Sequence, residues 1–261
     1  QKVKIKYNSF SFMKPIIFLG SKYIGYKCLN YLLEHVIELD IKISAVFTSK
    51  SKLDGKKTVE ELAKKANIPL FFEADDLLKI PAVDVLLSVQ YHQILKKKHL
   101  KRAMQTAVNL HMAPLPEYRG CNQFSFAILD KAPTFGTTLH LMDNSVDGGP
   151  ILFEKRFPVP SNCWVTDLYK MTVDASIDLF KENIENIIAQ NYEIRTQANL
   201  IEERGTSFHL RKEIDAIKQI DMNWSAEKIN RHIRATYFPP YEPPYTIVTG
   251  KKVYFKQSYN E

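Results

Sequence analysis

Three polar side chains near the middle of the chain have the types and spacing needed to move an acyl group onto an amine. Asn109 and His111 lie two positions apart at the start of NLHMAPLPEYRG, and Asp147 follows in the turn VDGGP at 146–150. An imidazole and an amide can bind the oxyanion of a tetrahedral intermediate. A carboxylate can accept the proton that the attacking nitrogen releases. If the three groups converge in the fold, the sequence predicts an acyl transferase.

The elements that must position these groups alternate between strand and helix over the first 110 residues. Short apolar runs predict strands, and apolar residues at helical spacing predict helices. This alternation predicts an α/β fold, a Rossmann-like and mostly parallel sheet with helices on both faces. Ligands bind beyond the carboxyl ends of such strands, where we expect segments 90–95 and 109–111. The predicted strands are 14–20, 41–49, 83–89 and 107–111, and the predicted helices are 23–35 and 58–68.

The second half of the chain has a different pattern. Alternating residues predict strands at 137–142 and 153–159 on either side of the VDGGP turn, followed by a long amphipathic helix at 166–189. We expect His140 to be a buried strand residue with a structural role. The last sixty residues predict a helix at 225–235 and a hairpin that turns near Thr249-Gly250, a small C-terminal β-hairpin/helix extension.

We therefore expect three parts. Residues 1–12, which precede Met13, are predicted to be an extension outside the fold or a remnant of an expression vector. Residues 13–200 are predicted to form the catalytic domain, and residues 201–261 a small subdomain with the helix and the hairpin.

Composition excludes several classes of protein. With 45% hydrophobic and 25% charged residues, and no apolar run near the roughly 18 residues of a membrane span, we expect a globular protein with no membrane partner. The opening residues lack the apolar core of a secretory signal. Three widely spaced cysteines argue against a disulfide framework or a zinc site. We expect a reducing, cytoplasmic location.

The formal net charge is +7, which raises the question of a nucleic-acid partner. The lysines are scattered in short groups, as at 50–52, 56–57, 96–98 and 251–252. No arginine-rich stripe alternates with aromatic residues, so we expect a solvated surface and no nucleic-acid partner.

The first predicted loop, GSKYIG at 20–25, lacks the middle glycine of the dinucleotide fingerprint and the Gly-Lys-Ser/Thr of a Walker loop. A turn at a strand–helix junction is often only structural. The alternative is that Ser21 and Lys22, at a helix N-terminus, hold a phosphate or a sugar hydroxyl of the substrate.

Taken together, four motifs resemble the folate-dependent formyltransferases, the family with the glycinamide-ribonucleotide-transformylase-like fold. The motifs are NLH at 109–111, PLPEYRG at 114–120, GTTLHLMD at 136–143 and VDGGPIL at 146–152. The upstream YHQIL at 91–95 is similar to an aromatic-x-x-Ile-Leu segment of the same family. The resemblance covers residues 14–245, and the combination is far more specific than any one motif.

The resemblance implies a reaction and a role for each group. The donor would be N10-formyltetrahydrofolate and the acceptor a primary amine, with no metal required. Asn109 would hold the formyl oxygen, and His111, supported by Asp147, would stabilise the oxyanion and carry a proton. Asp147 would take the proton of the attacking ammonium. The pterin would lie against the backbone of Gln93, Ile94 and Leu95 and against the loop 143–147, which includes Asp143 and Val146.

Three branches of the family differ in the acceptor. Enzymes that formylate methionyl-tRNA carry a C-terminal barrel and a longer basic insertion after the second strand, and glycinamide ribonucleotide formyltransferases normally end near the long helix. The tail IRATYFPPYEPPYTIVTGKKVYF is most similar to sugar N-formyltransferases. The expected substrate is a nucleotide-diphosphate-linked 4-amino or 3-amino deoxy sugar, of the dTDP-4-amino-4,6-dideoxyglucose type, used for surface polysaccharide or O-antigen. A formyltetrahydrofolate hydrolase and a non-catalytic nucleotide-sugar-binding module stay open.

Three further residues are candidates for contact with the nucleotide. Tyr237 and Tyr241 could stack on the base, since each combines an aromatic face with a polar tip, or could merely pack the hairpin. Arg119 could pair with a phosphate or could tie down its own loop. The resemblance also implies a homodimer in which the C-terminal segment forms the subunit contact.

Overall fold

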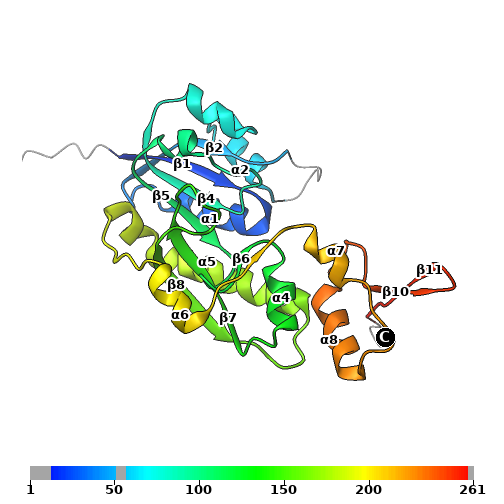
Figure 1. Cartoon of the computed structure of the whole chain (residues 1–261). Coiled ribbons are helices and arrows are strands. Elements are labelled where there is room, and N and C mark those ends of the chain that lie inside the picture. The colour runs from blue at the N-terminus through cyan, green and yellow to red at the C-terminus, as the bar shows by residue number, and fades with distance from the viewer. Residues whose placement is uncertain (1–12, 51–56, 258–261) are drawn as a thin grey trace, which may run out of the picture. The chain divides into compact units, whose positions relative to one another are not determined.

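The structure is a computed structural model that describes residues 13–50 and 57–257 (Figure 1). The predicted extension at 1–12 lies outside the described residues. The chain forms two compact units. Unit 1 comprises the residues up to Ala107 together with Glu185–Gln190, and unit 2 comprises Val108–Ile184 and the residues from Asn191 onward.

The main sheet has seven strands in the order β3-β2-β1-β4-β5-β7-β8, and helices surround it. Strands β1 to β4 pair in parallel, whereas β7 is antiparallel to both β5 and β8. This confirms the predicted Rossmann-like, mostly parallel α/β fold. The strands are β1 (Lys14–Gly20), β2 (Ile41–Phe47), β3 (Leu70–Phe71), β4 (Val83–Val89), β5 (Ala103–His111), β7 (Thr134–Leu141) and β8 (Ile151–Pro158).

Unit 1 follows the apolar pattern of its sequence closely. The runs IIFLG in β1 and VLLSV in β4 are buried, as expected for strands covered on both faces. Helix α2 (Val59–Lys65) begins where the side chain of Thr58 accepts a hydrogen bond from the amide of Glu61 and so caps the helix. The other helices are α1 (Lys22–Glu34), a 3-10 helix η1 (Ala74–Lys79) and α3 (Lys97–Leu100).

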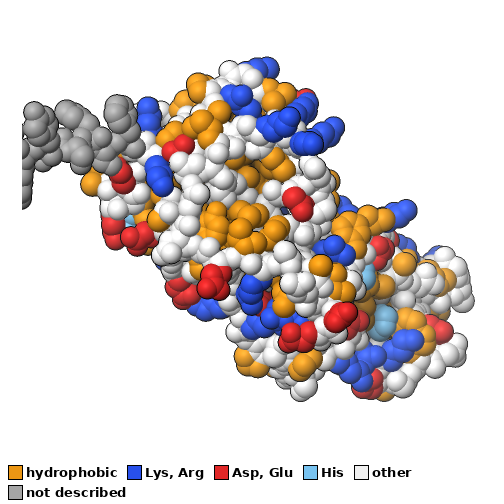
Figure 2. All heavy atoms as spheres, turned by 60° about the vertical axis from the view of Figure 1, so that its left-hand side comes forward, with side chains coloured by type: hydrophobic (Ala, Val, Ile, Leu, Met, Phe, Trp, Pro, Cys, Tyr) orange, Lys and Arg blue, Asp and Glu red, His pale blue; other side chains and the backbone are white. Residues whose placement is uncertain are grey.

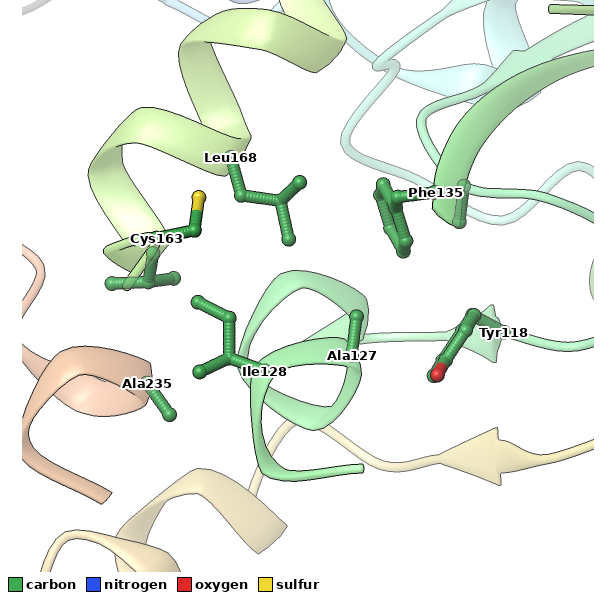
Figure 3. Packing of buried hydrophobic residues seen from close by; sticks show 9 residues of the cluster. Tyr118, Ala127, Ile128, Phe135, Cys163, Leu168 and Ala235 are labelled. Atoms are coloured by element: carbon green, nitrogen blue, oxygen red, sulfur yellow. The ribbon is translucent and has the colours of Figure 1, made fainter. Parts of the chain in front are cut away.

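Unit 2 has its own hydrophobic core, and the C-terminal part of the chain contributes to it. Ala235 of α8 is fully buried and lies beside Ile128 of α4 and Cys163 (Figure 3). The predicted boundary between residues 200 and 201 falls within α6, inside this unit. Its helices are α4 (Gln123–Leu129), α5 (Val165–Ala189, whose last turn belongs to unit 1), α6 (Ala198–Arg204), α7 (Glu213–Ile217) and α8 (Ala226–Thr236).

Two small sheets complete unit 2. Strands β10 (Tyr245–Val248) and β11 (Lys251–Tyr254) form the predicted hairpin, which turns at Thr249-Gly250 and extends away from α8 in Figure 1. Strands β6 (Arg119–Gly120) and β9 (Phe208–His209) pair in parallel although their paired residues are 89 positions apart in the sequence. The sequence pattern did not predict this second pairing.

No helix in the described part of the chain is long and apolar enough to cross a membrane.

Candidate functional site

The carboxyl end of β5 presents Asn109 and His111 at the place where ligands of α/β sheets bind. Strand β5 pairs antiparallel with β7, and the register sets Asn109 directly opposite His140. Side chains opposite each other on neighbouring strands are in contact range. The amide Nδ2 of Asn109 accordingly lies 3.1 Å from Nε2 of His140. The strand register therefore fixes how the Asn109 amide is turned.

His140 is buried, as the sequence suggested, but its surroundings are those of a site. Burial lowers the pKa of His140 to about 4, so the ring is neutral near pH 7. Its Nδ1 lies 2.8 Å from the carbonyl oxygen of Leu141, and must donate to it. Nε2 is then an acceptor and receives one N–H of Asn109. This leaves the second N–H of Asn109 available for another acceptor, a consequence that the sequence alone did not reveal.

His111 is held from two sides and its side chain is only 6% exposed. Its Nε2 lies 2.7 Å from the backbone carbonyl of Tyr118 and donates to it. Its Nδ1 lies 3.6 Å from Oδ1 of Asp147, too far for a hydrogen bond but within range of an ion pair. When protonated, the ring can therefore form an ion pair with the carboxylate while it keeps the bond to Tyr118.

Asp147 occupies the turn between β7 and β8 in a left-handed backbone conformation, with φ of 53°. Its Oδ2 accepts a hydrogen bond of 3.0 Å from the amide of Gly120, while Oδ1 faces both His111 and His140, the latter at 3.7 Å. The carboxylate side chain is 13% exposed. The structure thus brings Asn109, His111 and Asp147 together within unit 2, which is the condition that the sequence set for an acyl transferase.

Gln197 holds the turn that carries Asp147, and sequence reasoning missed it. This buried side chain donates hydrogen bonds of 2.7 Å to the backbone carbonyls of Asp147 and Gly149. A Cβ at Gly149 would collide with the carbonyl oxygen of Leu141, so only glycine fits there. Because Gln197 lies fifty positions from the turn, no local motif marks it.

This arrangement is suited to acyl transfer. A neutral amide N–H, an imidazole and a carboxylate lie around one point, and each is fixed by a partner of its own. Groups held in place before the reaction stabilise developing charge at no cost of reorganisation. A nearly buried carboxylate beside an imidazole can also accept and pass on a proton.

Arg119 lies next to this site, on β6. Its Nη1 is close to the turn at Gly148. Its Nε is buried and has no hydrogen-bond partner among the described residues. Its backbone amide donates a hydrogen bond to the carbonyl of Ser207, a contact that tests neither of the two roles expected of its side chain. The prediction that Arg119 contacts a phosphate stays open.

The predicted folate contacts lie in both units. In unit 1, Gln93 uses its side chain to hold its own loop: Oε1 accepts from the amide of Ala74 at 2.8 Å and Nε2 donates to Glu73. Ile94 is 72% exposed and Leu95 is half-buried. In unit 2, Asp143 and Val146 are exposed, and Asp143 accepts hydrogen bonds from the amide and hydroxyl of Ser145. Their contact with a pterin remains a prediction.

Ser21 and Lys22 lie in unit 1, at the junction of β1 and α1. Ser21 is buried, and its hydroxyl oxygen is 3.3 Å from that of Ser49. Lys22 donates to Oε1 of Gln90, just after β4, at 3.2 Å. The structure thus brings the first loop to the end of β4, and the predicted substrate contact stays a prediction.

The two tyrosines differ in environment. Tyr237 follows α8 and its ring meets the edge of Trp164 at 6.0 Å, whereas Tyr241 is 64% exposed and lies 5.9 Å from Phe238. Tyr237 is therefore partly a packing residue. In residues 13–50 and 57–257, no group of three or more His, Cys, Asp or Glu side chains could hold a metal ion.

Comparisons with known proteins agree with this geometry. The family model described as "Formyl transferase" matches residues 16–184. GDP-perosamine N-formyltransferase of Brucella melitensis biotype 1 is 29% identical over 175 residues, which are 66% of this chain. The chain spans 63% of the length of that relative. Methionyl-tRNA formyltransferase of Lactobacillus gasseri is 28% identical over 254 residues, 92% of this chain and 77% of the relative.

Among solved structures, the chain is similar to WlaRD, a sugar 3N-formyl transferase studied in the presence of dTDP and 5-N-formyl-THF. The TM-score is 0.74 and the sequence identity 26%. The similarity covers 92% of this chain and 85% of that one, so it extends through the C-terminal part.

Proposed function

Because the chain belongs to the formyl transferase family, we propose that it transfers a formyl group from N10-formyltetrahydrofolate to the amine of a nucleotide-diphosphate-linked amino deoxy sugar. The observation that carries the proposal is the convergence of Asn109, His111 and Asp147 around one point. The similarity to a sugar 3N-formyl transferase over 92% of this chain supports the acceptor class.

The reaction follows from the roles of the three groups. The second N–H of Asn109 donates to the formyl oxygen, and protonated His111 stabilises the charge that develops on it. Asp147 takes a proton from the attacking ammonium, so that the new bond from nitrogen to the formyl carbon can form. The bond from that carbon to N10 of the folate then breaks, and N10 leaves with a proton supplied through His111.

Other residues are proposed to bind the two substrates. Arg119 would pair with a phosphate of the nucleotide, and Ser21 and Lys22 with a phosphate or sugar hydroxyl. Tyr241, with its exposed ring, is better placed than Tyr237 to stack on a base. The proposed folate contacts are the backbone of Gln93, Ile94 and Leu95 in unit 1, and Asp143 and Val146 in unit 2.

A methionyl-tRNA acceptor is the second candidate, because the Lactobacillus gasseri relative aligns with 92% of this chain. The charge on one face of the molecule argues against it. On the face shown in Figure 2, Lys and Arg side chains are interspersed with Asp and Glu and form no continuous stripe. Proteins that bind nucleic acid need clustered positive charge.

The experiment that decides between them offers each acceptor separately with N10-formyltetrahydrofolate: dTDP-, UDP- and GDP-linked amino sugars, glycinamide ribonucleotide, and methionyl-tRNA. Mass spectrometry detects the formylated product. We expect product with a nucleotide sugar and none with the tRNA. Product with only the tRNA or glycinamide ribonucleotide would overturn the acceptor class, and formate released without any acceptor would indicate a hydrolase.

Three wider features belong to the same proposal. The product would serve surface polysaccharide or O-antigen synthesis. The enzyme would be a homodimer in which the exposed hairpin β10–β11 forms the subunit contact. Its location would be the cytoplasm, which agrees with three free cysteines.

A further inference from the structure

We infer that the segment 206–211, far along the chain from the catalytic residues, is a positioning element of the catalytic site. It holds the loop 116–122 in the conformation that orients His111 and Asp147. The inference rests on the proposed function, since it assigns a role in the same reaction. All of the contacts lie within unit 2.

The loop 116–122 supplies one backbone group to each of two catalytic side chains. The carbonyl of Tyr118 accepts from Nε2 of His111 at 2.7 Å, and the amide of Gly120 donates to Oδ2 of Asp147 at 3.0 Å. The first bond determines which ring nitrogen of neutral His111 carries the proton. The second fixes which carboxylate oxygen faces the imidazole. A shift of this loop would therefore disturb both groups.

The segment 206–211 pairs with this loop along its length. The amide of Arg119 donates to the carbonyl of Ser207, and the amide of Cys121 donates to the carbonyl of His209. In return, the amide and the hydroxyl of Ser207 donate to the carbonyl of Glu117 at 2.9 and 2.6 Å. Backbone groups of Glu117, Arg119 and Cys121 thus bond to the segment. The carbonyl of Tyr118 and the amide of Gly120, which lie between them, bond to the catalytic side chains.

Gly120 shows how closely the two strands approach. It has a φ of 84°, and a Cβ at this position would collide with the carbonyl oxygen of His209. Only glycine allows this contact while its amide still reaches Asp147.

Side-chain contacts also hold the C-terminal end of the loop 116–122 against the segment 206–211. Asn122, in a left-handed conformation with φ of 60°, donates to the carbonyls of Leu210 and Arg211 at 2.9 and 3.1 Å. The ring of His209 stacks on Phe126 of α4 with 3.4 Å between centroids. The segment is thus anchored to the core of unit 2 and can hold the loop rigidly.

The test uses variants that remove side-chain ties and leave the backbone pairing possible: Asn122→Gly, Ser207→Ala and the pair combined. Glycine tolerates the left-handed conformation of residue 122, so that change removes only the tie. The matched controls are Asn67→Gly, at a second asparagine with a left-handed conformation, and Ser161→Ala; both residues are exposed. Circular dichroism verifies that every variant folds.

We expect the combined variant to lose about 10- to 100-fold in kcat for formylation, with the KM of each substrate within about twofold of wild type, as for misplaced catalytic groups. The controls keep the wild-type kcat. Nuclear magnetic resonance of 15N-labelled histidine, assigned with His111→Gln, should show His111 changing from the Nε2–H tautomer to a mixture. Hydrogen exchange should speed up at Gly120.

The inference would be overturned if the folded combined variant kept the wild-type kcat, the wild-type tautomer of His111 and the wild-type rate of hydrogen exchange at Gly120. So would a loss of kcat with the tautomer and the exchange unchanged, because the loss would then arise elsewhere. If wild type formylates no amine but the tautomer and the exchange respond as expected, the proposed function fails while the positioning role stands.

Discussion

His111 and His140 share one carboxylate neighbour, but their surroundings assign them opposite roles. His140 is buried, its pKa is lowered to about 4, and its neutral ring accepts from Asn109. His111 faces a carbonyl on one side and a carboxylate on the other, so only its protonated form can donate in both directions. At the scale of single residues, one histidine orients the amide and the other lies between a carbonyl and a carboxylate.

The carboxylate of Asp147 is the group whose charge can be removed with the least change of shape. We expect Asp147→Asn to lower the rate of formyl transfer by at least ~10², because the amide can neither accept the ammonium proton nor pair with protonated His111. Single-turnover kinetics with N10-formyltetrahydrofolate measure the effect. His111→Ala should show a loss of similar size, and near-normal rates in both variants would refute the mechanism.

His140 makes stability depend on pH in a defined window. Its pKa is about 4 in the folded chain against an ordinary 6.5, so between these values the unfolded chain binds a proton that the folded chain excludes. The free energy of unfolding therefore falls as the pH is lowered from 6.5 to 4, by roughly 3 kcal/mol from this group, and is fully regained above pH 6.5.

In His140→Gln this part of the pH dependence should be absent, while the amide oxygen of glutamine can still accept from Asn109. Urea unfolding at pH 7 and pH 4.5 measures the difference for each protein. The exposed His92→Gln serves as the control and should behave like wild type. An equal loss of stability on acidification in His140→Gln and wild type would contradict this account.

At the scale of elements, strong local patterns in the sequence predicted the bounds of strands and helices well. The apolar runs predicted β1 and β4 at their observed bounds, and helical spacing predicted α5 and α8 within one residue at each end. Helix α4 and strands β6 and β9 were missed. They have two to seven residues, too few for a periodic pattern, and the two strands are defined by a partner distant in sequence.

Packing of α8 against α4 provides a test of how far the C-terminal part belongs to the core of unit 2. Ala235 is fully buried against Ile128 (Figure 3), so Ala235→Leu should cost about 1–3 kcal/mol in the free energy of unfolding through overpacking. Ala226→Leu, exposed at the start of the same helix, should change it by less than about 0.5 kcal/mol. Chemical denaturation measures both, and equal effects would show that the packing contributes nothing.

At the scale of the whole molecule, the candidate site was predictable only in part. The types and spacing of Asn109, His111 and Asp147 indicated a chemistry for them if they converged, and the structure places all three in unit 2. The sequence did not predict the residues that hold these three side chains in place. Gln197 and the segment 206–211 act through backbone contacts across 50 to 90 positions, and such contacts leave no local pattern in the sequence.

The proposed homodimer makes a prediction about mass. The hairpin β10–β11 exposes Ile247, Val248 and Val253, each to nearly half of its surface, and a two-stranded hairpin is only marginally stable alone. Light scattering should give about twice the 30.2 kDa of one chain. Aspartate at all three positions should yield monomers, whereas Ile37→Asp, on the exposed surface of unit 1, should not. A monomeric wild type, or a triple variant that stays dimeric, would refute the proposed contact.

The pairing of β6 with β9 also has a consequence for the timing of synthesis on the ribosome. Residues 109–147 are translated first, so a nascent chain contains all three catalytic side chains before the strand that braces their loop exists. At about 5–20 residues per second, segment 206–211 follows Asp147 after an interval on the order of several seconds. During that interval the growing polypeptide contains Asn109, His111 and Asp147 without the strand that braces their loop. If the inferred positioning role holds, the chain gains activity only once β9 has paired with β6.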